Sequence, residues 1–315
     1  MMRVISLLMG VVAALSYGVT SAQAQQFEPP PDQTPAATIE YDGKKSAALQ
    51  YGDISLTIDS KPISGGPERV PVAAGRYKGQ IAFTIRPSDD SAREEPTATV
   101  SLIVIDPSSP APQVVLSYFT GGAHCCVLTR IATLDKAGQW HIVDAGALDG
   151  DGYRFKDLDG NNGSELISVD NSFLYAFDCY ACSAAPTQIH KLVGAALKDV
   201  TREPQYQPFL RFKLRQLEAD ATKDGDRWGS NGFLGGWVAS KALVGELSGA
   251  WQTMLARYDR KSDFEMEECL TGAEPDKCPP DKLRKLSFPQ ALAKHLLAHG
   301  YITSNQLQQL QVPSP

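Results

Sequence analysis

The densest group of potential metal ligands lies in one acidic loop. Asp157, Asp159 and Asn161 place oxygen-bearing side chains at alternate positions of a tight turn, and Glu165 follows at the ninth position. Hard cations such as Ca²⁺ are bound by carboxylate and amide oxygens at this kind of spacing. The pattern therefore predicts a calcium site formed by these four residues. A polar hairpin turn, held by hydrogen bonds from side chain to backbone, is the alternative interpretation.

The same residues resemble the calcium loop of FG-GAP/VCBS-type propeller repeats, whose pattern is D-x-[DN]-x-D-G-x-x-D before a strand. Two positions depart from that pattern: Asn162 stands where the family usually has Gly, and Glu165 replaces the last Asp. The resemblance covers this loop alone, whereas a propeller needs several such blades. It implies calcium at the acidic loop and leaves the fold open.

The chain has six cysteines, and an even number in an exported protein favours disulfides over metal thiolates. Cys269 and Cys278 flank a short loop and are predicted to pair with each other.

The other four cysteines, Cys125, Cys126, Cys179 and Cys182, allow three pairings. A bond between the adjacent Cys125 and Cys126 would close a strained ring. We therefore expect cross-pairing of Cys125 and Cys126 with Cys179 and Cys182, without assigning the partners. Such bonds would staple the first and last parts of this region together.

Two alternative chemistries involve the same region. Cys179-Tyr180-Ala181-Cys182 has the C-x-x-C spacing of redox sites, but it does not open a helix after a strand. His124 lies beside Cys125, yet neighbouring strand residues point to opposite faces, so the two would not readily share a proton. We expect His124 to bond a nearby carbonyl group and predict no catalytic residue.

The run GGAHCC at residues 121–126, followed by D-x-D-G and then C-x-x-C-S-x-x-P, resembles a recurring pattern in uncharacterised exported bacterial proteins. The resemblance implies secretion and a stapled β module, and it brings no catalytic assignment. No P-loop, dinucleotide, Gly-x-Ser-x-Gly or His-Glu-x-x-His fingerprint occurs.

The first residues predict export. Met1–Ala24 has a basic start, a short apolar run and a small-x-small cleavage site, which are typical of a secretory signal peptide cleaved near Ala24. The Pro-rich residues 25–37 are expected to form an extended linker. We predict a periplasmic or secreted protein without a membrane span in the mature chain.

Residues 1–200 carry a net charge of −7 and residues 201–315 a net charge of +1, and no basic stripe with interleaved aromatics occurs. We therefore predict that nucleic acid is not a partner. The partner is predicted to be an unidentified protein or small-molecule ligand.

Residues 38–200 show β patterning. Short runs rich in Val, Ile and aromatics are separated by Gly, Pro, Asp and Ser clusters, with no helical pattern between them. Strands are expected over residues 54–58, 81–85, 99–105, 113–119, 127–134, 139–144, 153–157, 165–170, 173–177 and 187–192. This pattern predicts an antiparallel β domain: a sandwich, a barrel or a partial propeller.

Residues 201–315 show helical patterning. Leu210, Leu214 and Leu217 fit one helix, and an apolar face from Phe233 to Tyr258 predicts a single long helix. A capping box at Ser287 starts a further helix. The fold class is therefore α+β, with an all-β domain over residues 38–200 and an α-helical domain over residues 201–315.

A ligand-rich loop without an accompanying nucleophile and base favours a non-enzymatic, exported binding or interaction protein. The alternatives are a periplasmic enzyme (a hydrolase, or a thiol-disulfide oxidoreductase using Cys179 and Cys182) or an inhibitor of a cell-envelope enzyme.

Overall fold

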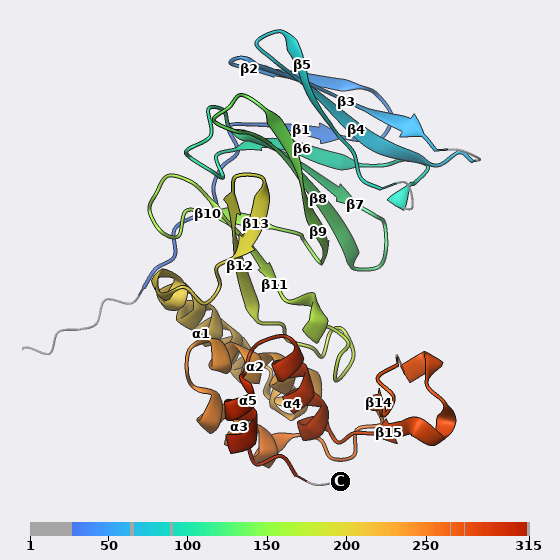
Figure 1. Cartoon of the computed structure of the whole chain (residues 1–315), viewed down its shortest axis with the longest axis vertical. Helices are drawn as coiled ribbons and strands as arrows, with labels where there is room; N and C mark the ends of the chain where they lie inside the picture. The colour runs from blue at the N-terminus through green and yellow to red at the C-terminus, as the bar shows by residue number, and fades with distance from the viewer. Residues whose placement is uncertain (1–26, 64–65, 89–90, 265, 274, 314–315) are drawn as a thin grey trace, which may run out of the picture.

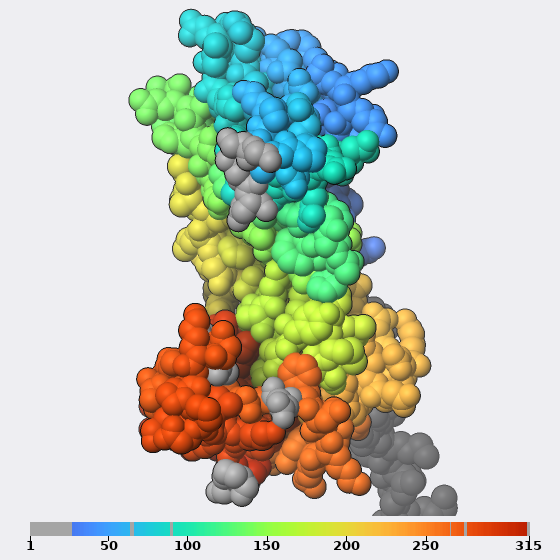
Figure 2. Space-filling model, turned by 90° about the vertical axis from the view of Figure 1, so that its right-hand side faces the viewer, coloured from blue at the N-terminus to red at the C-terminus, as the bar shows by residue number. Residues whose placement is uncertain are grey.

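A computed structural model describes residues 27–63, 66–88, 91–264, 266–273 and 275–313. The predicted signal peptide therefore lies outside the described residues. The described chain has three antiparallel sheets stacked above a cluster of helices (Figure 1), and the view turned by 90° shows the same elongated shape (Figure 2). The predicted α+β class, with an all-β N-terminal region, is confirmed, and none of the described sheets closes into a barrel.

The outer sheet is a four-stranded meander in the order β2-β3-β4-β5. Its strands are β2 (Ala47–Tyr51), β3 (Ile54–Pro62), β4 (Arg69–Tyr77) and β5 (Gln80–Ile85). Alternation along β3 points Ile54, Leu56 and Ile58 inward, where all three are buried. Along β3 only one face is buried, which explains why its period-two pattern is visible in the sequence.

The middle sheet has the order β1-β6-β7-β8-β9. Its strands are β1 (Ala37–Tyr41), β6 (Ala98–Ile103), β7 (Gln113–Phe119), β8 (Cys125–Leu134) and β9 (Trp140–Asp149). Val114, Leu116 and Tyr118 face the core shared with the outer sheet, whereas Val115 faces the core on the other side. Because both faces are covered, β7 has apolar side chains on both faces and shows no alternation from Val114 to Leu116.

The inner sheet has the order β10-β11-β12-β13 and connects the β region to the helices. Its strands are β10 (Arg154–Lys156), β11 (Glu165–Val169), β12 (Thr187–Val193) and β13 (Ala196–Asp199). Leu166 and Leu192 pack on the middle sheet, while Ile167 and Ile189 belong to the helical core. The inner sheet therefore contributes to two cores at once.

The helices follow at the lower end of the molecule (Figure 1). They are α1 (Gln207–Lys223), α2 (Asn231–Leu243), α3 (Leu247–Arg257), α4 (Phe288–Ala298) and α5 (Ser304–Gln309). A two-stranded hairpin, β14 (Glu267–Cys269) and β15 (Leu283–Lys285), projects beside them. None of the described helices is long and apolar enough to cross a membrane.

Two predicted elements differ from the structure, and the strands β1, β2, β4, β13, β14 and β15 were not among those predicted. The expected long helix is divided into α2 and α3, because Gly245 adopts φ +80° and ends the helical path while the apolar faces of both parts still pack inward. The strand expected at residues 173–177 is replaced by a 3₁₀ helix over Asn171–Phe173 and a turn. Phe173 and Phe177 are buried in the helical core, so burial rather than sheet pairing explains their apolar character.

Helix α2 lies unusually close to the segment that precedes β12. A Cβ atom on Gly236 would lie only 1.9 Å from the carbonyl oxygen of Ala184, so the backbones touch directly. The segment from Asp170 to Pro186 is thereby held against the helical core, and it borders the clefts described next.

Candidate functional site

The acidic loop brings three of its four predicted ligands together. Carboxylate oxygens of Asp157, Asp159 and Glu165 lie within 4.8 Å of one another. The oxygen of Asn161 instead accepts a hydrogen bond from the backbone N–H of Gly163 at 2.6 Å. Asp157 accepts the backbone N–H groups of Asn161 and the following residue at 3.0 and 2.9 Å. The loop thus contains the hydrogen bonds of a polar turn as well as a carboxylate cluster.

A lysine from the inner sheet reaches this carboxylate cluster. The Nζ atom of Lys191 lies 2.5 Å from Asp159 and 3.3 Å from Glu165. Glu165 is fully buried, and it also accepts the hydroxyl of Tyr206 at 3.0 Å and the N–H of Leu158 at 2.7 Å. Burial lowers the pKa of Lys191, but its hydrogen bonds to Asp159 and Glu165 outweigh burial and raise that pKa overall. Three carboxylates in one cluster suit a hard cation, although two of them already contact the ammonium group of Lys191. The calcium site therefore stays a prediction.

The cysteines pair within each motif, so the predicted cross-pairing is wrong. Disulfides join Cys125 to Cys126 and Cys179 to Cys182, and a third joins Cys269 to Cys278, the pair expected from their short loop. The pair in β8 lies where the register with β9 is irregular, between Cys125 and Val127. A strand that carries such a bulge accommodates a local ring that a regular strand would not.

The two cysteine motifs still meet, but through aromatic rings. The imidazole of His124 stacks on the ring of Tyr180, with 3.9 Å between centroids and 15° between planes. Nδ1 of His124 lies 2.9 Å from Oδ1 of Asp149, at the end of β9, and Nε2 lies 3.3 Å from the Tyr175 hydroxyl. The expected carbonyl partner of His124 is therefore a carboxylate. We call His124, Asp149, Tyr175 and Tyr180 the aromatic rim.

The aromatic rim has features of a recognition surface. The side chain of Tyr175 is 51% exposed. Its backbone has φ +60°, a conformation that is costly for residues other than glycine and that is concentrated at functional positions. Burial, and then the nearby Asp149 carboxylate, raise the pKa of Tyr180, which keeps its hydroxyl protonated. The sequence patterns assign no role to Asp149 or to the two tyrosines.

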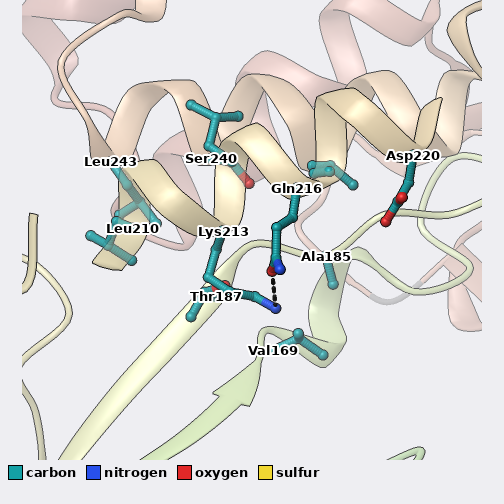
Figure 3. A pocket seen from close by; sticks show the side chains of 11 residues that line it. Val169, Ala185, Thr187, Leu210, Lys213, Gln216, Asp220, Ser240 and Leu243 are labelled. Atoms are coloured by element: carbon teal, nitrogen blue, oxygen red, sulfur yellow. Dashed lines mark hydrogen bonds between the residues drawn. The ribbon is translucent and has the colours of Figure 1, made fainter. Parts of the chain in front are cut away.

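Two adjoining cavities extend from the rim along the junction of the inner sheet and α1. The outer cavity, of about 260 Å³, is lined by Asp149 and Tyr180 of the rim and by residues at the ends of β9, β10 and β11. The inner cavity, of about 230 Å³, lies between β11, β12 and the helices α1 and α2 (Figure 3). Val169, Thr187 and Lys213 line both, so the two cavities form one cleft.

Polar atoms without partners lie beside the outer cavity. Ser168 is only 8% exposed, and its Oγ has no hydrogen-bond partner among the described residues. The same holds for the buried Oδ1 of Asn171, and both residues line the outer cavity. Buried polar atoms of this kind usually bond to water or to a bound molecule.

Lys213 lies where the two cavities join. Its half-buried side chain points from α1 toward Val169 and Thr187, and Nζ donates to Oε1 of Gln216 at 3.2 Å (Figure 3). In the described part of the chain no carboxylate lies within ion-pairing distance of Nζ. Burial, and then repulsion from Arg154 and Lys156, lower the pKa of Lys213.

The two cations near Lys213 are already ion-paired. Arg154 and Lys156 both bind Asp32, which belongs to the segment predicted to be a linker. That segment is fixed on the protein surface, because the N–H of Gln33 also donates to the carbonyl of Phe155 at 2.7 Å. Lys213 is thus the cation of this group that keeps its charge available to the cleft.

A signal for Lys213 was present in the sequence. Counting along α1, Lys213 lies three residues after Leu210 and four before Leu217, which puts it on the apolar face of that helix. A lysine at such a position must either reach solvent or serve a binding site.

Comparison with known proteins finds relatives over most of the chain. Residues 210–300, from α1 to the end of α4, match the family described as the sll0997 C-terminal domain. The chain is 35% identical over 275 residues to the uncharacterized protein y4bJ of Sinorhizobium fredii, covering 87% of this chain and 43% of y4bJ. It is 34% identical over 266 residues to the probable thylakoid lumen protein sll0997 of Synechocystis, covering 82% of this chain and 76% of that protein.

The chain therefore spans less than half of y4bJ and about three quarters of the Synechocystis protein. No solved structure matches it.

Proposed function

The chain belongs to the family of the probable thylakoid lumen protein sll0997, and on that premise we propose that it is an exported binding protein whose ligand occupies the cleft beside α1. Export is supported by the signal-like start of the sequence, by three disulfides and by the lumenal location in that relative's name.

The observation that carries the binding proposal is the cleft itself. Two cavities of about 230 and 260 Å³ share Val169, Thr187 and Lys213, and the lining combines apolar side chains with a few convergent polar groups. The partnerless atoms of Ser168 and Asn171 supply hydrogen-bonding capacity that the described residues leave unused. Tyr180 of the aromatic rim lines the outer cavity and adds aromatic surface to it.

We favour recognition over catalysis because the cysteines and the histidine near the cleft already have bonding partners. All four cysteines near the cleft are oxidised, and both ring nitrogens of His124 already have partners. The side chains that line the cleft are therefore suited to hold a molecule through hydrogen bonds and apolar contact.

The binding proposal can be tested by a substitution on the inner sheet that fills the cleft with a larger side chain. Val169 lines both cavities, so Val169→Trp should block them, while Val193→Trp places the same bulk on β12 at an exposed position outside the cleft. The probe is N-phenyl-1-naphthylamine, a neutral dye that fluoresces in apolar sites. We expect binding to the wild type and to Val193→Trp, with at least a tenfold loss in Val169→Trp. Equal dye binding by the two variants would refute the cleft as the binding site.

A further inference from the structure

We propose that the cleft selects an amphipathic anion, with its acidic head on Lys213 and its apolar body in the inner cavity. This inference rests on the proposed function and specifies the chemical class of its ligand.

The inner cavity is built for an apolar body. Leu210, Leu214 and Leu217 of α1 form one apolar wall, and Leu243 of α2 and Val169 of β11 add apolar surface opposite the polar side chains that also line the cavity. These side chains come from three different elements of the fold, and so the shape of the cavity depends on the packing of α1 and α2 on the inner sheet. Removing apolar ligand surface from water at such walls contributes roughly 25 cal/mol per Å² before the costs of binding.

The position of the acidic head follows from the charges that face the cleft. Lys213 is surrounded by Arg154 and Lys156 of β10, by Asp32 of the N-terminal segment and by Asp220 on its own helix. Asp32 is bound by Arg154 and Lys156, and Asp220 contacts Lys223 on the surface at 3.0 Å. An anion placed on Lys213 would therefore meet an excess of positive charge, in a site where burial strengthens the attraction.

Neighbouring polar groups fit the same position. Gln216 already holds Nζ of Lys213 in place, and Thr187 lies beside this lysine side chain (Figure 3). Ser240 also lines the cavity, and its hydroxyl donates to the carbonyl of Gly236. Toward the outer cavity, the carboxylates of Asp149 and Asp151 would repel a second acidic group. A ligand with a single acidic end is therefore favoured over one that is acidic at both ends.

The test compares two dyes with the same ring system. 8-Anilino-1-naphthalenesulfonate is N-phenyl-1-naphthylamine with a sulfonate group added. Because a hydrogen bond to a charged group contributes about 1.5–3 kcal/mol, we expect Lys213→Met to weaken binding of the sulfonate dye by about 10- to 100-fold. Binding of the neutral dye should change less than about twofold, and Lys213→Arg should keep the preference for the sulfonate. Circular dichroism and melting temperature verify that each variant folds.

The head group is then identified by competition. Octanoate and octyl phosphate should displace the sulfonate dye from the wild type, and the stronger competitor identifies the acid; octanol should not compete. Equal displacement by octanol, or loss of both dyes in Lys213→Met, overturns the inference while the cleft remains a binding site. If the wild type binds neither dye, the proposed function fails together with it.

Discussion

The close contact between α2 and the segment before β12 can be tested by changing two glycines to alanine, because the two changes should shift the free energy of unfolding in opposite directions. Both Gly236 in α2 and Gly249 in α3 lie within helices. A Cβ atom at Gly236 would meet the carbonyl oxygen of Ala184 at 1.9 Å, whereas at Gly249 nothing lies within 4 Å. The same change, glycine to alanine, should therefore destabilise the protein at the first position and stabilise it at the second.

The magnitudes follow from two competing effects. Alanine is favoured over glycine inside a helix by about 1 kcal/mol, and this gain applies at both sites. At Gly236 a backbone oxygen blocks the added methyl group, so α2 must move away from Ala184, and overpacking of this kind costs roughly 1–3 kcal/mol or more. Because the blocking atom is a backbone oxygen at 1.9 Å, we take the upper end of that cost, about 3 kcal/mol, which leaves a net loss of about 2 kcal/mol in Gly236→Ala. Gly249→Ala should gain about 0.5–1 kcal/mol.

Urea unfolding under non-reducing conditions, followed by tryptophan fluorescence, measures both values by linear extrapolation. The slope with denaturant should stay constant, because neither change alters the surface exposed on unfolding. If Gly236→Ala is as stable as the wild type, the close packing of α2 on Ala184 is refuted. If both variants lose stability equally, glycine has another role in these helices.

Four further outcomes are expected. Lys191→Met leaves the buried Glu165 without its cation and should cost about 2–4 kcal/mol at pH 7, measured by urea unfolding against the wild type. If the acidic loop takes calcium, 1 mM-range Ca²⁺ should raise the melting temperature of Lys191→Met but not that of Lys191→Met combined with Asp157→Asn. Burial, and then His299, lower the pKa of His295 to about 4, whereas the histidine of the unfolded state has a pKa near 6.5. The unfolded state therefore binds this proton at a higher pH than the folded state does, and acidification favours unfolding. The free energy of unfolding should fall from pH 7 to pH 5 by about 1 kcal/mol more in the wild type than in His295→Gln, after allowance for partial exposure. Iodoacetamide should modify no cysteine without reductant, and labelling of the native protein would restore the oxidoreductase alternative.

The fold class could be predicted because local patterns reflect local burial. The strand predicted at residues 113–119 is β7 with the same bounds, since its side chains are apolar on both faces and polar residues flank it. Strand β2 was missed because its burial is weak throughout. The segment from Phe173 to Phe177 was misassigned because aromatic side chains entering a helical core resemble those of a buried strand when only their hydrophobicity is visible.

The candidate site was only partly accessible from sequence. Asp157, Asp159 and Glu165 are close in the chain, so their convergence follows from one turn. The lysine that contacts them comes from another strand, and the cysteine pairing depended on a register irregularity that no spacing rule reveals. Lys213 was detectable in principle, because a charge on an apolar helix face is a local anomaly, but the cavity it serves exists only after α1 docks on the inner sheet.

The dual role of the inner sheet has a practical consequence for dissecting the protein. Cutting the chain after residue 200 would strip the helices from Ile167 and Ile189 and leave a naked hydrophobic surface on β11 and β12. The helical fragment would in turn lose the sheet against which its apolar side chains pack. Each fragment alone is therefore expected to aggregate, whereas co-expression of the two fragments should restore a native-like assembly.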